Sequence, residues 1–346
     1  MTTQTPAISV LMAVRNGSPF IDKALASLAD QEFTDFEIVL IDNGSSYDTG
    51  RIISKWINAE PRLRVFRLAR PGLARSLNHA AAMARGTLLA RLDSDDVALP
   101  SRLGLQYAMI QDRPALGLLG SFVELIDREG RVICERRLPV TDAELKRFLH
   151  SGNPFVHSTI MMRRDAFERA GGYREGLRLC EDFDLWCRLA EVTEFANLDR
   201  PLVRYRLHAS AMSFRQATRV ALVDVCIIAA QQARLRGEPE PFDRGMPKLR
   251  QALTLLHMPR AVLLYQVLKI NTNAARLALE FGDRQQSRTL RRRAYRLLMT
   301  LPRGRAMWRG VGHIAASYFH PHSRQRRKTL YATLLNLLPP SRWRTN

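Results

Sequence analysis

The first hundred residues alternate between short apolar runs and helical patterns. Four runs have the length and composition of buried strands: 8–14, 36–41, 63–68 and 87–92. A helical pattern follows each of the first three, and Ser18 and Pro19 have the character of a cap and first helical residue. This alternation predicts an α/β fold with a doubly wound, mostly parallel sheet that helices cover on both faces.

After this region the pattern becomes mixed. We expect paired strands within 116–134 with a turn at 127–130, helices at 142–149 and 181–190, and strands at 158–162 and 202–207. Beyond Ser213 the chain turns into Leu-, Ala- and Arg-rich helical patterns with few β-branched runs. We therefore predict an α/β domain at 1–214 and a basic helical region at 215–346.

The fourth apolar run leads directly into three carboxylates within four positions, Asp93, Asp95 and Asp96. Ligands of open α/β sheets bind at the carboxyl ends of the strands. Crowded carboxylates at that edge suit a hard divalent cation, which bridges protein oxygens to substrate phosphates. The alternative is an Asp-rich helix start before Pro100, which explains one acid better than three.

The second strand also ends on an acid, Asp42, and we expect it at the same edge with Arg15 and Asn16. Alternatively, Asp42 caps the next helix. The chain has neither a G-x-G-x-x-G after its first strand nor a G-x-x-x-x-G-K-[ST] motif. The chain therefore lacks the phosphate-binding loop that a dinucleotide-dependent enzyme or an ATPase needs.

Five segments, in this order and spacing, resemble the motifs of family 2 glycosyltransferases: 8–17, 41–45, 72–78, 92–96 and 181–186. The resemblance covers about residues 6–214 and leaves the basic region unassigned. It implies a GT-A fold, a nucleotide-sugar donor, a divalent metal (Mn²⁺ or Mg²⁺) and inversion at the anomeric carbon. The Q-x-x-R-W motif of processive members is absent, so we expect a single addition.

By the same resemblance, Asp42 binds the base, most often uracil, and Asp93 and Asp95 form the D-x-D pair. Metal ligation falls to Asp95 or Asp96, with His208 as a further ligand or a surface histidine. The residues that the resemblance assigns to the donor are Val14, Arg15, Asn16, Asp42, Arg75, Asp93 and Asp95.

The resemblance makes Asp182 the general base that takes the proton of the acceptor hydroxyl. Glu181, Asp184 and His157 are its candidate partners in acceptor binding. From the residues alone, Glu181 and Asp182 fit a helix N-terminus better than a catalytic pair, and only the resemblance reverses this preference; a structural hydrogen bond explains His157 at least as well as acceptor binding.

Nearly all of the +20 net charge lies in the second region. Residues 1–214 carry 28 Lys and Arg against 27 Asp and Glu, whereas 215–346 carry 25 against 6. Arginines at 284–296 alternate with Leu, Tyr and Met, and basic residues at 324–328 precede the apolar run 330–335; both patterns are typical of helices on an anionic membrane surface. Nucleic-acid binding and a solvated basic face are the alternatives, and we expect no nucleic-acid partner.

The four cysteines form no C-x-x-C pair, no signal-like segment precedes the first strand, and no apolar run is long enough to span a bilayer. We therefore expect a cytoplasmic enzyme, peripheral on the inner face of the membrane. It would transfer a sugar from a UDP-sugar to a glycan or lipid-linked acceptor. The alternatives are a nucleotidyltransferase acting on a sugar phosphate and a non-catalytic polybasic nucleic-acid-binding protein.

Overall fold

The computed structural model describes residues 5–68, 72–208, 216–243, 246–257 and 284–300, with the pairs 267–268, 271–272 and 274–275. The chain divides into two compact units, Met1–Arg206 and Leu207–Asn346. This division lies eight residues before the boundary drawn from composition. Each unit is described below by itself.

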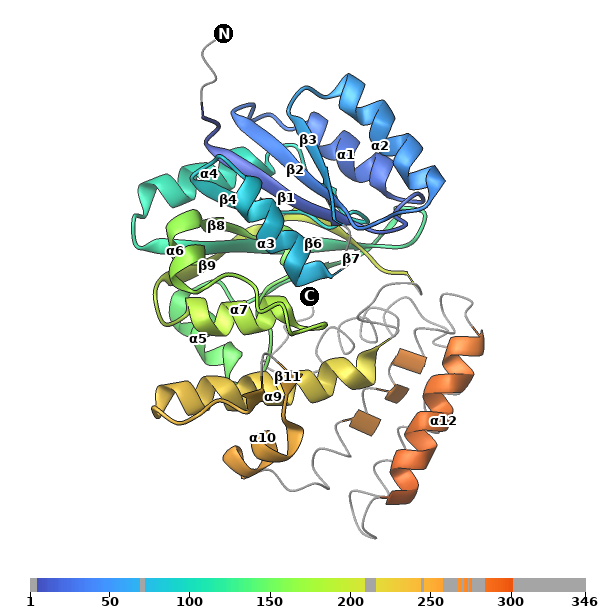
Figure 1. Ribbon diagram of the computed structural model, residues 1–346, viewed down its shortest axis with the longest axis vertical. Helices are drawn as coiled ribbons and strands as arrows, with labels where there is room; N and C mark the ends of the chain where they lie inside the picture. Colours follow the sequence, from blue (N-terminus) through green and yellow to red (C-terminus); the bar gives the residue numbers. More distant parts are fainter. Residues whose placement is uncertain are drawn as a thin grey trace. The chain divides into compact units, whose positions relative to one another are not determined.

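The first half of unit 1 is a parallel sheet in the order β3-β2-β1-β4 (Figure 1). Its strands are β1 (Ile8–Val14), β2 (Phe36–Asp42), β3 (Leu63–Arg67) and β4 (Leu88–Arg91). Every residue of β1, β2 and β4 is buried, because helices cover both faces of this sheet and leave no solvated side. The predicted α/β fold with a mostly parallel sheet is confirmed here.

The second half of unit 1 extends the same sheet with a mixed part. Beyond β4 the order is β8 (Met161–Arg163), β6 (Leu116–Ile126), β9 (Glu194–Arg206) and β5 (Val97–Ala98), and β7 (Val132–Arg136) pairs with β6. β8 runs antiparallel to β4 and β6, whereas β9 runs parallel to β6. β9 begins eight residues before the predicted 202–207 strand, because its first half carries charged residues and a proline that hide the apolar pattern.

The helices of unit 1 are α1 (Ile21–Ala29), α2 (Tyr47–Ala59), α3 (Leu73–Met83), α4 (Arg102–Asp112), α5 (Asp142–Leu149), α6 (Arg164–Arg169) and α7 (Glu181–Leu189). The predicted cap at Ser18 is wrong. α1 has Phe20 at its N-cap position, and a turn on the Gly17 carbonyl precedes the helix. The predicted strand at 158–162 is in part a 3-10 helix, η1 (His157–Thr159), because the N–H and the hydroxyl of Thr159 both donate to the Val156 carbonyl.

Unit 2 contains the helices α9 (Ala217–Leu235), α10 (Leu249–Leu255) and α12 (Arg284–Thr300) and a short hairpin, β10 (Phe242–Asp243) with β11 (Met246–Pro247). α9 and α10 pack around Cys226, Ala229 and Ala252. In the part of the chain that the structure describes, no helix is both long and apolar enough to cross a bilayer. The basic segment at 324–328 lies outside the described residues.

Candidate active site

The loops that follow β1 and β2 are joined to each other. Val14 and Asp42 are paired at the ends of the two strands. Asn16 adopts a left-handed backbone conformation with φ of 56°. Its N–H donates to the Ser45 hydroxyl at 3.1 Å, and its side-chain carbonyl accepts from the Ser46 N–H at 2.8 Å. Left-handed backbone conformations in residues other than glycine concentrate at functional sites. Here the conformation of Asn16 allows it to bond both Ser45 and Ser46, which joins the two loops.

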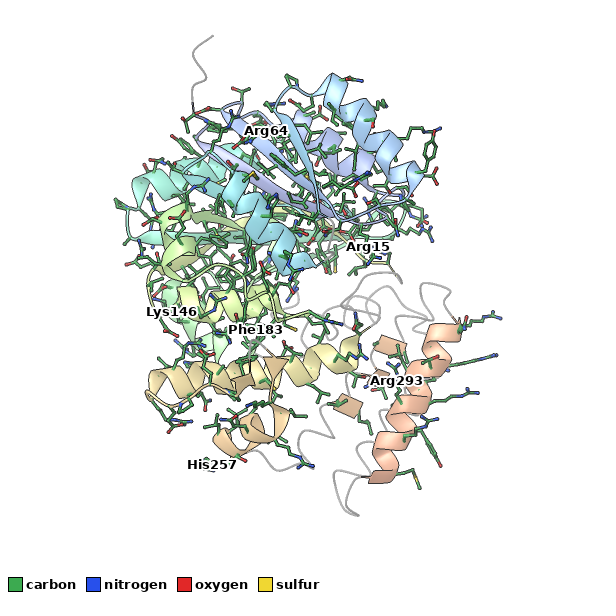
Figure 2. All side chains as sticks on the ribbon, in the orientation of Figure 1. Arg15, Arg64, Lys146, Phe183, His257 and Arg293 are labelled. Atoms are coloured by element: carbon green, nitrogen blue, oxygen red, sulfur yellow. The ribbon has the colours of Figure 1, made fainter. Side chains whose placement is uncertain are left out.

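Asp42 is buried and holds its own loop in place. One carboxylate oxygen accepts the Ser45 N–H at 2.9 Å, and the other accepts Arg67 at 3.2 Å. The N-cap of α2 is Ser46, so the Asp42 carboxylate closes the loop rather than capping the helix. Arg15, labelled in Figure 2, follows β1 directly and is exposed.

The start of α3 reaches this same edge of the sheet. The Ser76 hydroxyl donates to the Asn43 side chain at 2.6 Å, which ties α3 to the end of β2. Its neighbour Arg75 pairs with Glu175 at 3.0 Å, and both side chains are 44% exposed. Exposed pairs contribute only about 0–1 kcal/mol, so Arg75 can exchange this partner for a phosphate at small cost.

The three carboxylates after β4 have different environments. The Asp96 side chain is buried: one oxygen accepts the backbone N–H of Arg206 at 2.8 Å, and the other accepts the hydroxyl of Ser158. Burial, and then the carboxylates of Asp95 and Asp93, raise the pKa of Asp96 well above its ordinary value. Asp95 is partly exposed, and its main-chain carbonyl accepts Arg206 Nε at 2.8 Å.

Asp93 is held between a buried cation and a hydroxyl. Arg91, which is fully buried, donates to one carboxylate oxygen, and the Ser158 hydroxyl, which shares its one proton between Asp93 and Asp96, lies 3.0 Å from the other. Burial raises the pKa of Asp93, but Arg91, His157 and the hydrogen bonds together hold it below its ordinary value. The Asp93 carboxylate is therefore ionised, and its hydrogen bonds hold it in a fixed orientation.

The residues that the structure describes contain no group of three or more His, Cys, Asp or Glu side chains arranged to hold a metal ion. The oxygen donors present are the carboxylates of residues 93–96, which we call the acidic loop. Mg²⁺ binds one or two protein carboxylates together with substrate phosphates. The partly exposed Asp95 fits such a donor set, whereas both oxygens of the buried Asp96 have protein partners.

The start of α7 carries the second group of acids. Cys180, its N-cap residue, has a left-handed backbone with φ of 59°. Asp182 is partly exposed and accepts the Asn153 amide at 2.8 Å. Glu181 is buried, and burial followed by the charges of Asp182 and Asp93 raises its pKa to about 8. η1 links this helix to the end of β4, because its His157 ring packs against Trp186 of α7 and its Ser158 hydroxyl hydrogen-bonds Asp93.

The third acid of α7 is held inside the protein by ion pairs with two arginines. Asp184 is fully buried and pairs with Arg188 at 2.7 Å and Arg174 at 3.6 Å. Arg188 also donates to the Ala170 carbonyl, so this pair joins α7 to the end of α6.

His157 lies in an aromatic cluster next to the acids. Its Nε2 is 2.8 Å from the Tyr173 hydroxyl, and its ring packs edge-on against Trp186 at 5.8 Å. Burial, and then the charge of Arg91, lower the pKa of His157 to about 4, against the opposing charges of Asp182 and Asp93. The imidazole is therefore neutral at physiological pH.

His208 lies two residues past β9 and past the boundary between the units. It is 8% exposed, and its predicted metal or phosphate role stays a prediction.

The sequence patterns did not single out several residues that organise the site. Ser158 holds two acids of the acidic loop, Arg91 binds the first of them, Asn153 binds Asp182, and Tyr173 binds His157. Arg91 alone carried a local signal, as a charged residue in a strand that is otherwise apolar. The contacts of Ser158, Asn153 and Tyr173 join residues that lie 16 to 65 positions apart in the sequence.

Comparison with known proteins gives concordant matches. The family described as "Glycosyl transferase family 2" matches residues 9–171. The O-antigen biosynthesis glycosyltransferase WbnJ of Escherichia coli is 32% identical over 206 residues, which are 58% of this chain and 80% of WbnJ.

Two solved structures share the fold. S. aureus TarS 1-349 in complex with UDP-GlcNAc has a TM-score of 0.54 at 18% identity, covering 94% of this chain and 92% of TarS. The mannosyltransferase PcManGT from Pyrobaculum calidifontis, in complex with GDP-Man and Mn²⁺, has a TM-score of 0.52 at 17% identity, covering 97% and 86%. The expected GT-A fold is thereby confirmed.

Proposed function

The chain belongs to glycosyl transferase family 2 and is a glycosyltransferase, and from this premise we propose that it transfers a single sugar, with inversion, from a UDP-sugar to a glycan or lipid-linked acceptor. The family relationship disfavours the two alternatives, a nucleotidyltransferase and a non-catalytic nucleic-acid-binding protein.

One observation carries the proposal: η1 joins two acid groups that lie more than 80 residues apart in the sequence. Ser158 of η1 hydrogen-bonds Asp93, after β4, at 3.0 Å, and the neighbouring His157 packs against Trp186 of α7, the helix whose first turn carries Asp182. Inversion needs donor-binding groups on one side of the anomeric carbon and a general base on the other. Asp93 fits the donor side, and the partly exposed Asp182, oriented by Asn153, fits the base.

We assign cation binding to Asp95. Asp96 holds the acidic loop in place through its hydrogen bonds with Arg206 and Ser158. When bound, the cation neutralises charge that develops on the leaving diphosphate. Asp42, Val14, Arg15 and Asn16 form the proposed base-binding edge, and Arg75 the proposed phosphate contact.

The solved relatives support a nucleotide-sugar donor and a metal. TarS was solved with UDP-GlcNAc, and PcManGT with GDP-Man and Mn²⁺. The name of WbnJ supports an acceptor in O-antigen or related polysaccharide synthesis.

The decisive experiment measures UDP release from UDP-sugars with Mn²⁺, with and without acceptor glycans. Asp182→Asn should reduce transfer by about 10²- to 10⁴-fold, the usual contribution of a general base, and leave UDP binding unchanged. Asp165→Asn, an exposed acid on α6, is the matched control. Lost UDP binding in Asp182→Asn would assign Asp182 to the donor instead, and transfer equal to that of the control would refute its role as base.

We also propose that region 215–346 docks the enzyme on the anionic cytoplasmic face of the membrane. α12 buries Ser287, Leu290 and Ala294. It exposes Tyr295, Met299 and five arginines at 284, 288, 292, 293 and 296; Arg293 is labelled in Figure 2. Basic residues near an anionic surface contribute about 1 kcal/mol each.

Sedimentation with vesicles containing phosphatidylglycerol tests this docking. Salt-sensitive binding that Arg288→Glu with Arg292→Glu abolishes would support it. Binding to DNA with no binding to vesicles would replace the membrane with nucleic acid as the partner.

A further inference from the structure

Arg206, the last residue of β9, contacts three loops at once. Its Nε donates to the Asp95 carbonyl at 2.8 Å, and its Nη1 donates to the Asp127 and Arg128 carbonyls, both at 3.0 Å. Its guanidinium also lies over the ring of Phe20, 4.9 Å from the centroid. One side chain therefore joins the acidic loop, the β6–β7 turn and the segment before α1.

The backbone of the same residue completes the contact with the acidic loop. The N–H of Arg206 donates to the Asp96 carboxylate at 2.8 Å. Arg206 is only 2% exposed, and burial lowers the pKa of its guanidinium against the opposing charges of Asp96, Asp95, Asp127 and Glu129. Its directed hydrogen bonds and these acids together compensate for the burial of its charge.

The β6–β7 turn gives the guanidinium a fixed platform. The Asp127 carboxylate accepts the Arg131 N–H at 2.9 Å and its guanidinium at 2.8 Å. The Gly130 N–H donates to the Asp127 carbonyl at 3.1 Å, and Gly130 has a φ of 96°, which only glycine adopts readily. Two carbonyls held by this closed turn anchor one end of the Arg206 guanidinium, and the Asp95 carbonyl receives the other.

We propose that Arg206 is a positioning residue for cation binding, fixing the backbone at Asp95 so that its carboxylate meets the metal–diphosphate. The inference rests on the proposed function. It gives Arg206 no contact with the cation; its effect passes through the main chain of Asp95 and the side chain of Asp96.

The shape of the guanidinium is part of the inference. Its planar fork separates the donors that reach the Asp95 carbonyl from those that reach Asp127 and Arg128. A lysine ammonium has the same charge but is a compact point donor, so it cannot bridge both sets of carbonyls. The charge alone should therefore be insufficient.

The experiment compares Arg206→Ala and Arg206→Lys with Arg204→Ala. Arg204 lies two residues earlier on β9, is 43% exposed and pairs with Glu124 at 2.8 Å, so it is a matched control. Mn²⁺ binding is followed by electron paramagnetic resonance with UDP present, and activity is titrated against Mn²⁺. Circular dichroism and thermal melting report the folded fraction.

Residues that orient metal ligands typically affect metal affinity by about 10- to 100-fold, and we expect a rise of that size in the half-saturating Mn²⁺ concentration for Arg206→Ala. Arg206→Lys should lie between it and wild type, and Arg204→Ala should match wild type. If Arg206→Ala does not fold, Arg206→Lys decides by the same titration.

A lower signal at every Mn²⁺ concentration with an unchanged midpoint would show a merely structural role and overturn the inference. Equal titrations for Arg206→Ala and Arg204→Ala would also overturn it. If the wild-type protein itself binds no Mn²⁺ with UDP, the proposed function fails first, so the two failures are distinguishable.

Discussion

The acidic loop after β4 and the start of α7 each carry three acids, yet they bury them by different means. In the acidic loop, the buried Asp96 has hydrogen-bond donors on both oxygens, from Arg206 and Ser158. At α7, Asp184 is paired with arginines, whereas burial makes Glu181 a poor site for charge. In the acidic loop Asp93 and Asp95 are both partly exposed, but Arg91 and Ser158 bind Asp93; at α7, Asp182 is partly exposed. Counting acids in a motif therefore overstates the number available for chemistry.

The most direct test of this comparison removes one partly exposed acid and one buried acid from the acidic loop. Asp95→Asn should lower metal-dependent transfer by about 10²-fold or more, since a metal supplies several kcal/mol of charge stabilisation. Asp96→Asn should lower the melting temperature more than it changes the cation dependence of the remaining activity. Steady-state rates over a Mn²⁺ series measure both effects, and the reverse order would make Asp96 the ligand.

The largest stability effect should come from Asp184. Asp184→Asn leaves Arg188 and Arg174 without their buried carboxylate, and breaking a buried pair from one side costs about 3–5 kcal/mol. Urea denaturation gives the free energy of unfolding. A loss below about 1 kcal/mol would contradict a structural role and return Asp184 to the list of acceptor-binding candidates.

Glu181 should make stability depend on pH. Its pKa is about 8 in the folded protein against 4.5 in the unfolded chain, so the folded state binds the extra proton between these values. Stability should therefore fall as pH rises from about 5 to 8. Glu181→Gln removes that slope, so its melting temperature should exceed that of wild type by more at pH 8 than at pH 5. A difference that does not change with pH would refute the raised pKa.

The smallest effect should come from the exposed Arg75–Glu175 pair. Glu175→Gln should change the free energy of unfolding by less than about 1 kcal/mol. If Arg75 binds the donor diphosphate, the same variant should leave donor affinity equal or slightly higher, because the arginine loses a competing partner. Calorimetric titration with UDP measures this, and a clear loss of affinity would contradict the exchange.

Much of the fold was predictable because the relevant signals are local. Buried parallel strands are continuous apolar runs, so 8–14, 36–41 and 87–92 were readable to within a residue or two. The exceptions have local causes as well. β9 begins with charged residues, and both the N–H and the hydroxyl of Thr159 donate to the Val156 carbonyl, which forms a 3-10 turn instead of a strand.

The sequence alone determined that acids lie at the ends of β2 and β4 and at the start of α7, because strand ends and helix starts follow from periodicity and composition. Only the tertiary structure decided which of those acids are taken up by internal contacts. Ser158 and Arg206 reach Asp96 from 62 and 110 residues away, and no pattern along the chain encodes pairings of that length. Such contacts form where the folded backbone brings β9 and η1 beside the acidic loop, and there burial and hydrogen bonding set the charge of each carboxylate.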